Sequence, residues 1–123
     1  MEKVNVAEAF GSFDEQWSPR LAAEANGQEV KLAKVDGEFV WHRHDDADEL
    51  FFLIDGRLRI ELREEEADVV LEEGEFVVVP RGIEHRPVAP DGATRILLFE
   101  PGGTRNTGNV ESERTVTDTE RLR

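Results

Sequence analysis

Short runs of apolar residues, separated by turn-forming residues, fill the middle of the chain. Leu58, Ile60 and Leu62 alternate with charged residues, which is the period-two pattern of a half-buried strand. The pattern predicts strands at 20–25, 30–35, 39–44, 49–54, 57–63, 69–71, 76–79, 85–88 and 95–99. The apolar run 76–79 is expected to be a buried strand. Many short strands without alternating helices favour a closed β-barrel or a sandwich.

The predicted turns carry the residues that tolerate positive φ. Asn26-Gly27 predicts a hairpin turn, and further turns are predicted at Asp36-Gly37 and at residues 90–92. The three glutamates of residues 64–66 predict a solvent-facing hairpin.

The predicted strand 39–44 has a distinctive composition. Because side chains alternate along a strand, Val40, His42 and His44 are expected on one face. The residues between them (Phe39, Trp41, Arg43) are then expected on the opposite face.

Two terminal segments flank the predicted strands. Residues 1–19 contain Phe10 and Phe13 at roughly helical spacing, and a helix could not continue past Pro19. We expect a short helical arm whose aromatic side chains, Trp17 included, pack on the outside of the main domain or on a partner subunit. Residues 102–123 are polar and are expected to be disordered or to wrap across the barrel. The chain is thus divided into an arm (1–19), a barrel (20–101) and a tail (102–123).

The charge of the chain restricts its partners. Its 28 acidic and 15 basic residues give a net charge of −13, which disfavours nucleic acid and anionic membranes as partners. Three of the basic residues are lysines, and this balance favours adaptation to high salt over an ordinary acidic protein of an arginine-rich proteome. There is no apolar run of about 20 residues and no signal-peptide pattern, so we expect a cytoplasmic protein.

The three histidines and one glutamate predict a metal site. The chain has no cysteine, so a metal ion would be held by nitrogen and oxygen atoms. His42 and His44 share one face of a predicted strand, and Glu49 begins the next strand. His85 would arrive from a distant strand when the barrel closes. Imidazole and carboxylate are ligands of Zn, Mn, Fe and Ni. We therefore predict one divalent ion, with about two coordination positions left for water or substrate.

These segments resemble the two motifs of the cupin superfamily, G-x5-H-x-H-x3,4-E-x6-G and G-x5-P-x-G-x2-H-x3-N. The matching residues are Gly37, His42, His44, Glu49 and Gly56 in the first motif, and Gly74, Pro80, Gly82 and His85 in the second. Two departures occur: four residues separate Gly37 from His42, and Ala89 replaces the final asparagine. Neither departure falls on a metal ligand of the family, so the resemblance supports the same four ligands.

The resemblance also implies a fold and an assembly. It implies an all-β double-stranded β-helix, or jelly roll, with the metal inside, a small-molecule ligand and commonly a homodimer. The chain is similar to the small single-domain cupins that carry the label mannose-6-phosphate isomerase-like.

Three functions remain open from the sequence. The first is a metal-dependent, isomerase-like enzyme that acts on a small sugar or hydroxy-carbonyl compound. The second is an Fe- or Mn-dependent dioxygenase, and the third is a non-catalytic binding or sensor protein. No catalytic base stands out beyond the ligands. Phe51 is expected to line the pocket, and Arg81 and Arg86 are candidate anchors for a phosphate or carboxylate, although solvated surface arginines are the commoner case.

Overall fold

The computed structural model describes residues 1–63 and 67–122, so the hairpin predicted at residues 64–66 lies outside the described residues. Within them, one short helix precedes seven strands: α1 (Val6–Phe10), β1 (Arg20–Ala25), β2 (Gln28–Glu38), β3 (Glu49–Asp55), β4 (Leu58–Leu62), β5 (Val69–Leu71), β6 (Phe76–Val79) and β7 (His85–Pro101). No helix in this described part has the length and apolar composition needed to cross a membrane. The predicted all-β class is confirmed.

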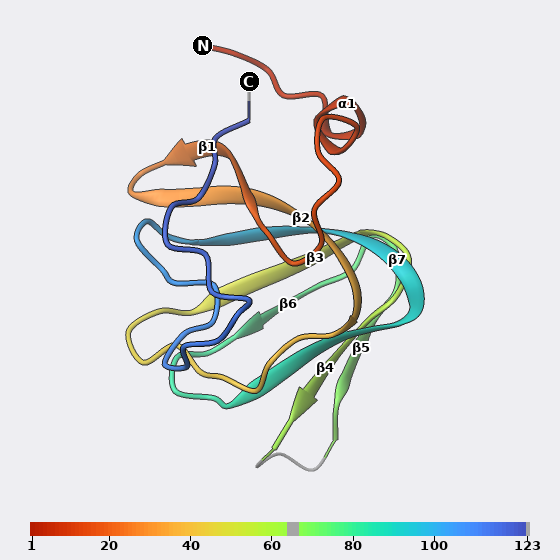
Figure 1. The fold of residues 1–123 in the computed structure, drawn as a ribbon, viewed down its shortest axis with the longest axis vertical. Coiled ribbons are helices and arrows are strands. Elements are labelled where there is room, and N and C mark those ends of the chain that lie inside the picture. The colour runs from red at the N-terminus through yellow and green to blue at the C-terminus, as the bar shows by residue number, and fades with distance from the viewer. Residues whose placement is uncertain (64–66, 123) are drawn as a thin grey trace.

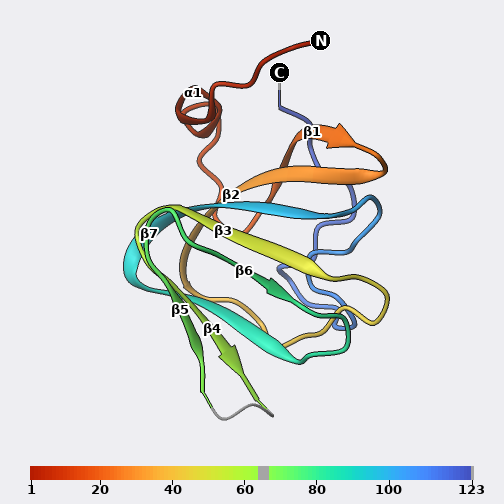
Figure 2. The same ribbon diagram turned by 180° about the vertical axis from the view of Figure 1, so that it is seen from behind.

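The strands form two antiparallel layers that share β7. One layer has the order β1-β2-β7-β3-β6, and in the other β4 pairs with both β5 and β7. The first residues of β7, 85–88, pair with β4, whereas residues 95–99 pair with β3. β7 bends between these two pairings and so joins the layers (Figures 1 and 2). β2 pairs with β7 on both sides of the bend. This arrangement is the jelly roll that the resemblance implied.

Two of the predicted turns are wrong. Asp36-Gly37 lies within β2, and residues 90–92 lie within β7. Between these strands the pairing passes from Val35–Thr94 to Gly37–Ala89 with a register shift. Such a bulge bends both strands without ending their pairing. Turn-type residues therefore mark the bend of the barrel here and not a reversal of the chain.

The predicted strand 39–44 is also wrong, because only His42 forms a bridge, with His85. Phe39 turns into the barrel, where its ring stacks on Trp17 with centroids 4.8 Å apart. Without a continuous ladder, nothing enforces the alternation of a pleated strand over residues 39–41. His42 and His44 are nevertheless both buried, as expected.

The N-terminal arm contributes to two separate apolar clusters. Phe10 and Phe13 pack against Leu32, outside the barrel, as predicted. Trp17 instead joins the main core inside the barrel, and its indole N–H donates to the Asp36 carbonyl at 2.9 Å. The expectation that all arm aromatics lie outside is therefore wrong for Trp17, whose indole N–H finds its partner at the bend of β2.

The described part of the tail, residues 102–122, runs back over the barrel. The Leu122 N–H donates to the Leu21 carbonyl at 2.8 Å, and Thr107 is fully buried. Gly108 lies so close to the histidine loop that an added Cβ would be 2.2 Å from the Arg43 carbonyl oxygen. Of the two expectations for the tail, wrapping is confirmed for these residues.

The strand predicted to be buried at 76–79 is an edge strand with an exposed apolar face. Phe76 and Val78 of β6 are 62% and 46% exposed, respectively. The expectation was wrong because residue type alone does not reveal that one face of β6 is left uncovered.

Candidate metal centre

The four predicted ligands come together from three parts of the chain. His42 and His44 lie between β2 and β3, Glu49 begins β3, and His85 begins β7. The backbones of His42 and His85 exchange two hydrogen bonds, of 3.0 and 2.8 Å. The bend in β7 thus places the second motif directly beside the first.

One ligand atom from each of these four side chains lies within 4.8 Å of the others. Glu49 Oε1 is 3.2 Å from His44 Nε2 and 3.5 Å from His85 Nε2. Opposite ligands of one ion are separated by about 4 Å when each bond is about 2.1 Å long. The cluster therefore has nearly the size of a coordination sphere.

Backbone carbonyls orient two of the imidazoles. His42 Nδ1 is 2.9 Å from the Val40 carbonyl oxygen, and His85 Nδ1 is 2.9 Å from that of Ile83. Because a carbonyl can only accept, each Nδ1 carries the proton. The Nε2 lone pairs are left free, which is the arrangement that second-sphere contacts impose on metal-binding histidines.

Several polar atoms of the cluster lack ordinary partners. His44 Nε2, His85 Nε2 and Glu49 Oε1 are buried and have no hydrogen-bond partner among the described residues. Leaving buried polar atoms unpaired costs about 1–3 kcal/mol each. A divalent cation would satisfy all three atoms, so the donor set of three nitrogens and one carboxylate fits a metal ion.

The ionisation states also suit a cation. Burial and the neighbouring His85 lower the pKa of His42 to about 4, so its imidazole is neutral at pH 7. Burial alone would raise the pKa of Glu49, but the neighbouring side chains of His44, His85 and Glu100 outweigh it and hold that pKa well below its usual range. The site thus offers a neutral imidazole and a carboxylate, the forms that bind metals.

A second buried carboxyl group, on Glu100, lies directly beside the cluster. Leu50 pairs with Phe99 across β3 and β7, so Glu49 and Glu100 are neighbours on the two paired strands, and Lys31 Nζ donates to Glu100 Oε1 at 3.0 Å. Glu100 Oε2 is buried and has no hydrogen-bond partner among the described residues. Burial and the charge of Glu49 raise the pKa of Glu100 to about 9, which favours its protonated form. A protonated Glu100 can donate to Glu49.

Sequence reasoning missed the Lys31–Glu100 pair, although the sequence contains a signal. Glu100 is in phase with the inward-facing Ile96 and Leu98 of β7, and Lys31 is in phase with the inward-facing Ala33. Opposite charges at inward positions of two strands indicate a buried pair, but only once the pairing of β2 with β7 is known.

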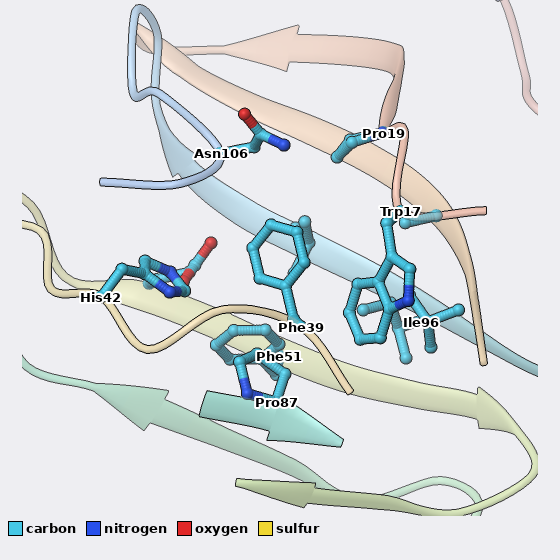
Figure 3. A pocket seen from close by; sticks show the side chains of 12 residues that line it. Trp17, Pro19, Phe39, His42, Phe51, Pro87, Ile96 and Asn106 are labelled. Atoms are coloured by element: carbon cyan, nitrogen blue, oxygen red, sulfur yellow. The ribbon is translucent and has the colours of Figure 1, made fainter. Parts of the chain in front are cut away.

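A small apolar cavity of about 30 Å³ lies next to His42 and Glu49 (Figure 3). Such a cavity has room for a molecule of about the size of water. Its walls are mainly carbon, and the Phe39 ring stands between His42 and Trp17. Asn106 also lines it, but its amide donates to the Arg114 carbonyl and accepts from the Val116 N–H.

A second, more polar cavity of about 320 Å³ lies between the tail and the loop of residues 44–47 that precedes β3. His44 is the ligand that reaches it, and the other lining residues include Asp45, Asp46, Thr104, Arg105 and Asn109. The cluster is therefore flanked by an apolar inner cavity and a polar outer cavity.

The three residues expected around the pocket lie in different places. Phe51 lines the inner cavity and meets His85 edge to face, with ring centroids 6.0 Å apart. Arg81 pairs with Asp48, and Arg86 pairs with Glu61. Neither arginine lines the inner or the outer cavity.

Comparison with known proteins agrees with the geometry. Residues 28–99, more than half of the chain, match the family described as Cupin domain. The chain belongs to the cupin family. A cupin-2 domain containing protein from Shewanella frigidimarina is 43% identical, with a TM-score of 0.75 over 80% of this chain and 93% of that chain. A Neisseria meningitidis protein is 26% identical, with a TM-score of 0.73 over 82% of this chain and 100% of that one.

A curated relative matches a smaller part of this cupin. The uncharacterized protein YdbB of Bacillus subtilis (strain 168) is 39% identical over 64 residues, which are 52% of this chain and 56% of YdbB. The chain thus spans little more than half the length of that relative.

The structure gives a physical reason for one glycine of the cupin motif. Gly56 has φ of 102°, and an added Cβ would lie 2.4 Å from Thr94 Oγ1. A side chain would be strained here by both the backbone conformation and the contact. Gly56 thus lets β3 end against β7, the two strands that carry Glu49 and His85.

Proposed function

We propose that this cupin binds one divalent metal ion through His42, His44, Glu49 and His85 and acts on a small molecule at that ion. The observation that carries the proposal is the set of converging, buried ligand atoms without hydrogen-bond partners. A bound ion would supply Lewis acidity and free coordination positions. The protein's residues hold the imidazoles in register, and the inner side of the site is walled mainly by apolar side chains.

The two cavities favour an uncharged ligand over a sugar phosphate. Among the described residues, no lysine or arginine lines the inner cavity. In the outer cavity, Arg105 Nε donates to the Gly108 carbonyl, Asp45 pairs with Arg43, and Asp46 adds a negative charge. The outer cavity therefore offers no excess of positive charge to hold a phosphate group. We therefore propose a small neutral hydroxy-carbonyl compound as the ligand, and an isomerase-like proton transfer as the reaction.

An O₂-consuming reaction is the second candidate. The inner cavity favours it, because a carbon-walled space of about 30 Å³ beside two ligands admits a small apolar molecule more readily than a sugar. The isomerase hypothesis requires a base beyond the ligands, and the protonated Glu100 beside the cluster could serve only as an acid.

The two candidates and simple ligand binding are separated by one set of assays. Protein loaded with Fe(II), Mn(II) or Zn(II) is tested for oxygen uptake and, by NMR, for conversion of neutral hydroxy-carbonyl compounds and their phosphate esters. Conversion of the neutral compounds without oxygen uptake supports the isomerase, and uptake only with Fe or Mn supports the dioxygenase. Ligand-dependent melting shifts without any product support a binding protein instead. The His85→Ala variant is the control and should show no turnover.

We further propose that the chain forms a homodimer through the outer face of β6, β3 and β7. The register aligns two apolar rows across these strands: Val78, Leu50 and Phe99 in one, and Phe76, Phe52 and Leu97 in the other. Three of these side chains are more than one-third exposed, and apolar patches of this kind mark association surfaces.

Sedimentation equilibrium tests this assembly. A dimer is expected for the wild type and a monomer for Phe76→Glu. Val70→Glu changes an equally apolar, 48% exposed position on β5 of the other layer and should remain dimeric. A monomeric wild type, or a dimeric Phe76→Glu, would refute the proposed interface.

A further inference from the structure

The buried pair of Lys31 and Glu100 has no role in the metal centre as described so far. Lys31 is 2% exposed and Glu100 is 1% exposed. Burying a charged group in a protein interior costs several kcal/mol, and apolar residues of similar volume are often as stable or more stable. Stability alone therefore gives a weak reason for placing a lysine and a carboxyl group here.

The position of the pair points to Glu49. Glu100 and Glu49 are buried neighbours on the paired strands β7 and β3, and Lys31 Nζ donates to Glu100 Oε1 at 3.0 Å. The other carboxyl oxygen of Glu100, Oε2, is buried without a hydrogen-bond partner among the described residues and is the atom available to Glu49. Lys31 is itself fixed by Glu29, whose Oε1 is 3.4 Å from Nζ. The result is a chain of contacts from β2 through β7 to the one carboxylate of the cluster.

Glu100 does not belong to the coordination cluster itself. The ligand atoms that lie within 4.8 Å of one another come from His42, His44, Glu49 and His85, and Glu100 is outside this group. Its contact with a metal ion would be indirect, through Glu49. Such outer contacts fix the orientation of ligating carboxylates, and their loss typically costs about 10–100-fold in metal affinity.

We propose that Glu100, anchored by Lys31, is a positioning residue that holds the Glu49 carboxylate toward the three imidazoles and so sets the affinity for the metal. This inference rests on the proposed metal site. Without the Glu100 contact, the Glu49 side chain would gain other rotamers, and the metal would have to order it on binding.

The test measures the dissociation constant for Zn(II) or Co(II) by competition with a chelator. The main variant is Lys31→Met with Glu100→Leu, which removes both polar groups together and leaves neither of them buried without its partner. We expect metal binding about 10–100-fold weaker than in wild type, with metal-free melting unchanged or higher. Glu100→Gln keeps a hydrogen-bond donor toward Glu49 and is expected to stay within about threefold of wild type.

A matched control removes a different ion pair of β7. Arg95→Gln with Asp55→Asn deletes the 2.8 Å pair between β7 and β3, which lies away from the cluster, and should leave the affinity unchanged. Should the Lys31/Glu100 double variant fail to fold, Lys31→Gln is titrated in its place, and weaker metal binding is again expected.

Three results would overturn the proposal. One is an unchanged affinity in the double variant or in its Lys31→Gln replacement. The second is a lowered metal-free melting temperature with unchanged affinity, which indicates a purely structural pair. The third is an affinity in Glu100→Gln as low as in the double variant, which indicates that a hydrogen-bond donor at this position does not orient Glu49. If wild type itself binds no metal, the proposed function fails, and this outcome is distinct from all three.

Discussion

Protonation of His42 should destabilise the metal-free protein in acid. The pKa of this imidazole is lowered from 6.5 to about 4 by burial and by His85, and its Nδ1–H donates to the Val40 carbonyl. In the unfolded chain the imidazole is expected to protonate near its ordinary pKa. Protons therefore bind the unfolded state first, and the stabilising contribution present above pH 6.5 is lost as the pH falls toward 4.

The size of this effect follows from the shift in pKa. The pKa of His42 differs by about 2.5 between the folded and unfolded states, and a difference of one in pKa corresponds to about 1.4 kcal/mol. The free energy of unfolding should therefore fall by about 3 kcal/mol between pH 6.5 and 4. Glu100 acts in the opposite sense. Because its folded pKa is raised to about 9, its contribution is present below pH 4.5 and is lost as the pH rises toward 9. The total pH profile is therefore flatter than the His42 contribution alone.

A variant isolates the His42 contribution. His42→Asn keeps an N–H donor for the Val40 carbonyl but cannot titrate, whereas the Glu100 contribution is common to both proteins. Urea unfolding is measured with a chelator present at several pH values from 7.5 to 4. The free energy of unfolding of wild type, relative to the variant, should fall by about 3 kcal/mol over this range. A difference that stays constant within about 0.5 kcal/mol would refute the buried neutral state of His42.

Three further predictions concern the packing and the charge. Gly108→Ala should weaken the contact of the tail with the Arg43 carbonyl, because an added Cβ has no room there. The tail of the variant should therefore be cleaved faster by a protease than the tail of the wild type. Equal cleavage rates would contradict the close packing. Trp17→Ala should lower the free energy of unfolding in urea by about 3–5 kcal/mol, because a core aromatic side chain and its hydrogen bond are lost. A decrease below about 1 kcal/mol would contradict the buried position of the indole. Raising NaCl from about 0.1 to 2 M should raise the melting temperature, since salt screens the repulsion of a chain with net charge −13, and a decrease would argue against salt adaptation.

Motif spacing predicted the cluster better than local pattern predicted the strands around it. His42, His44, Glu49 and His85 do converge, because the chemistry of the ligands restricts which residues can occupy these positions. The path between them was less predictable. Strand alternation predicts the wrong side for Phe39, since the direction of this side chain depends on Trp17, a residue of the distant arm.

Features that depend on long-range pairing were the hardest to predict. The Asp36-Gly37 dipeptide has the composition of a turn, and only the continued pairing of β2 with β7 makes it a bulge. Glu100 likewise has the residue type and position of a surface residue near the end of a strand, and only its contact with Lys31 explains its burial. The cytoplasmic location and the homodimer stay predictions.

Metal stoichiometry tests the central claim most directly. Wild type and His85→Ala are dialysed against the same buffered Zn(II) or Mn(II), and bound metal is measured by elemental analysis alongside protein concentration. The account predicts about one ion per chain for wild type and a loss of that ion in His85→Ala, because one of four buried ligands is removed. Stoichiometric metal in His85→Ala, or none in wild type, would contradict it.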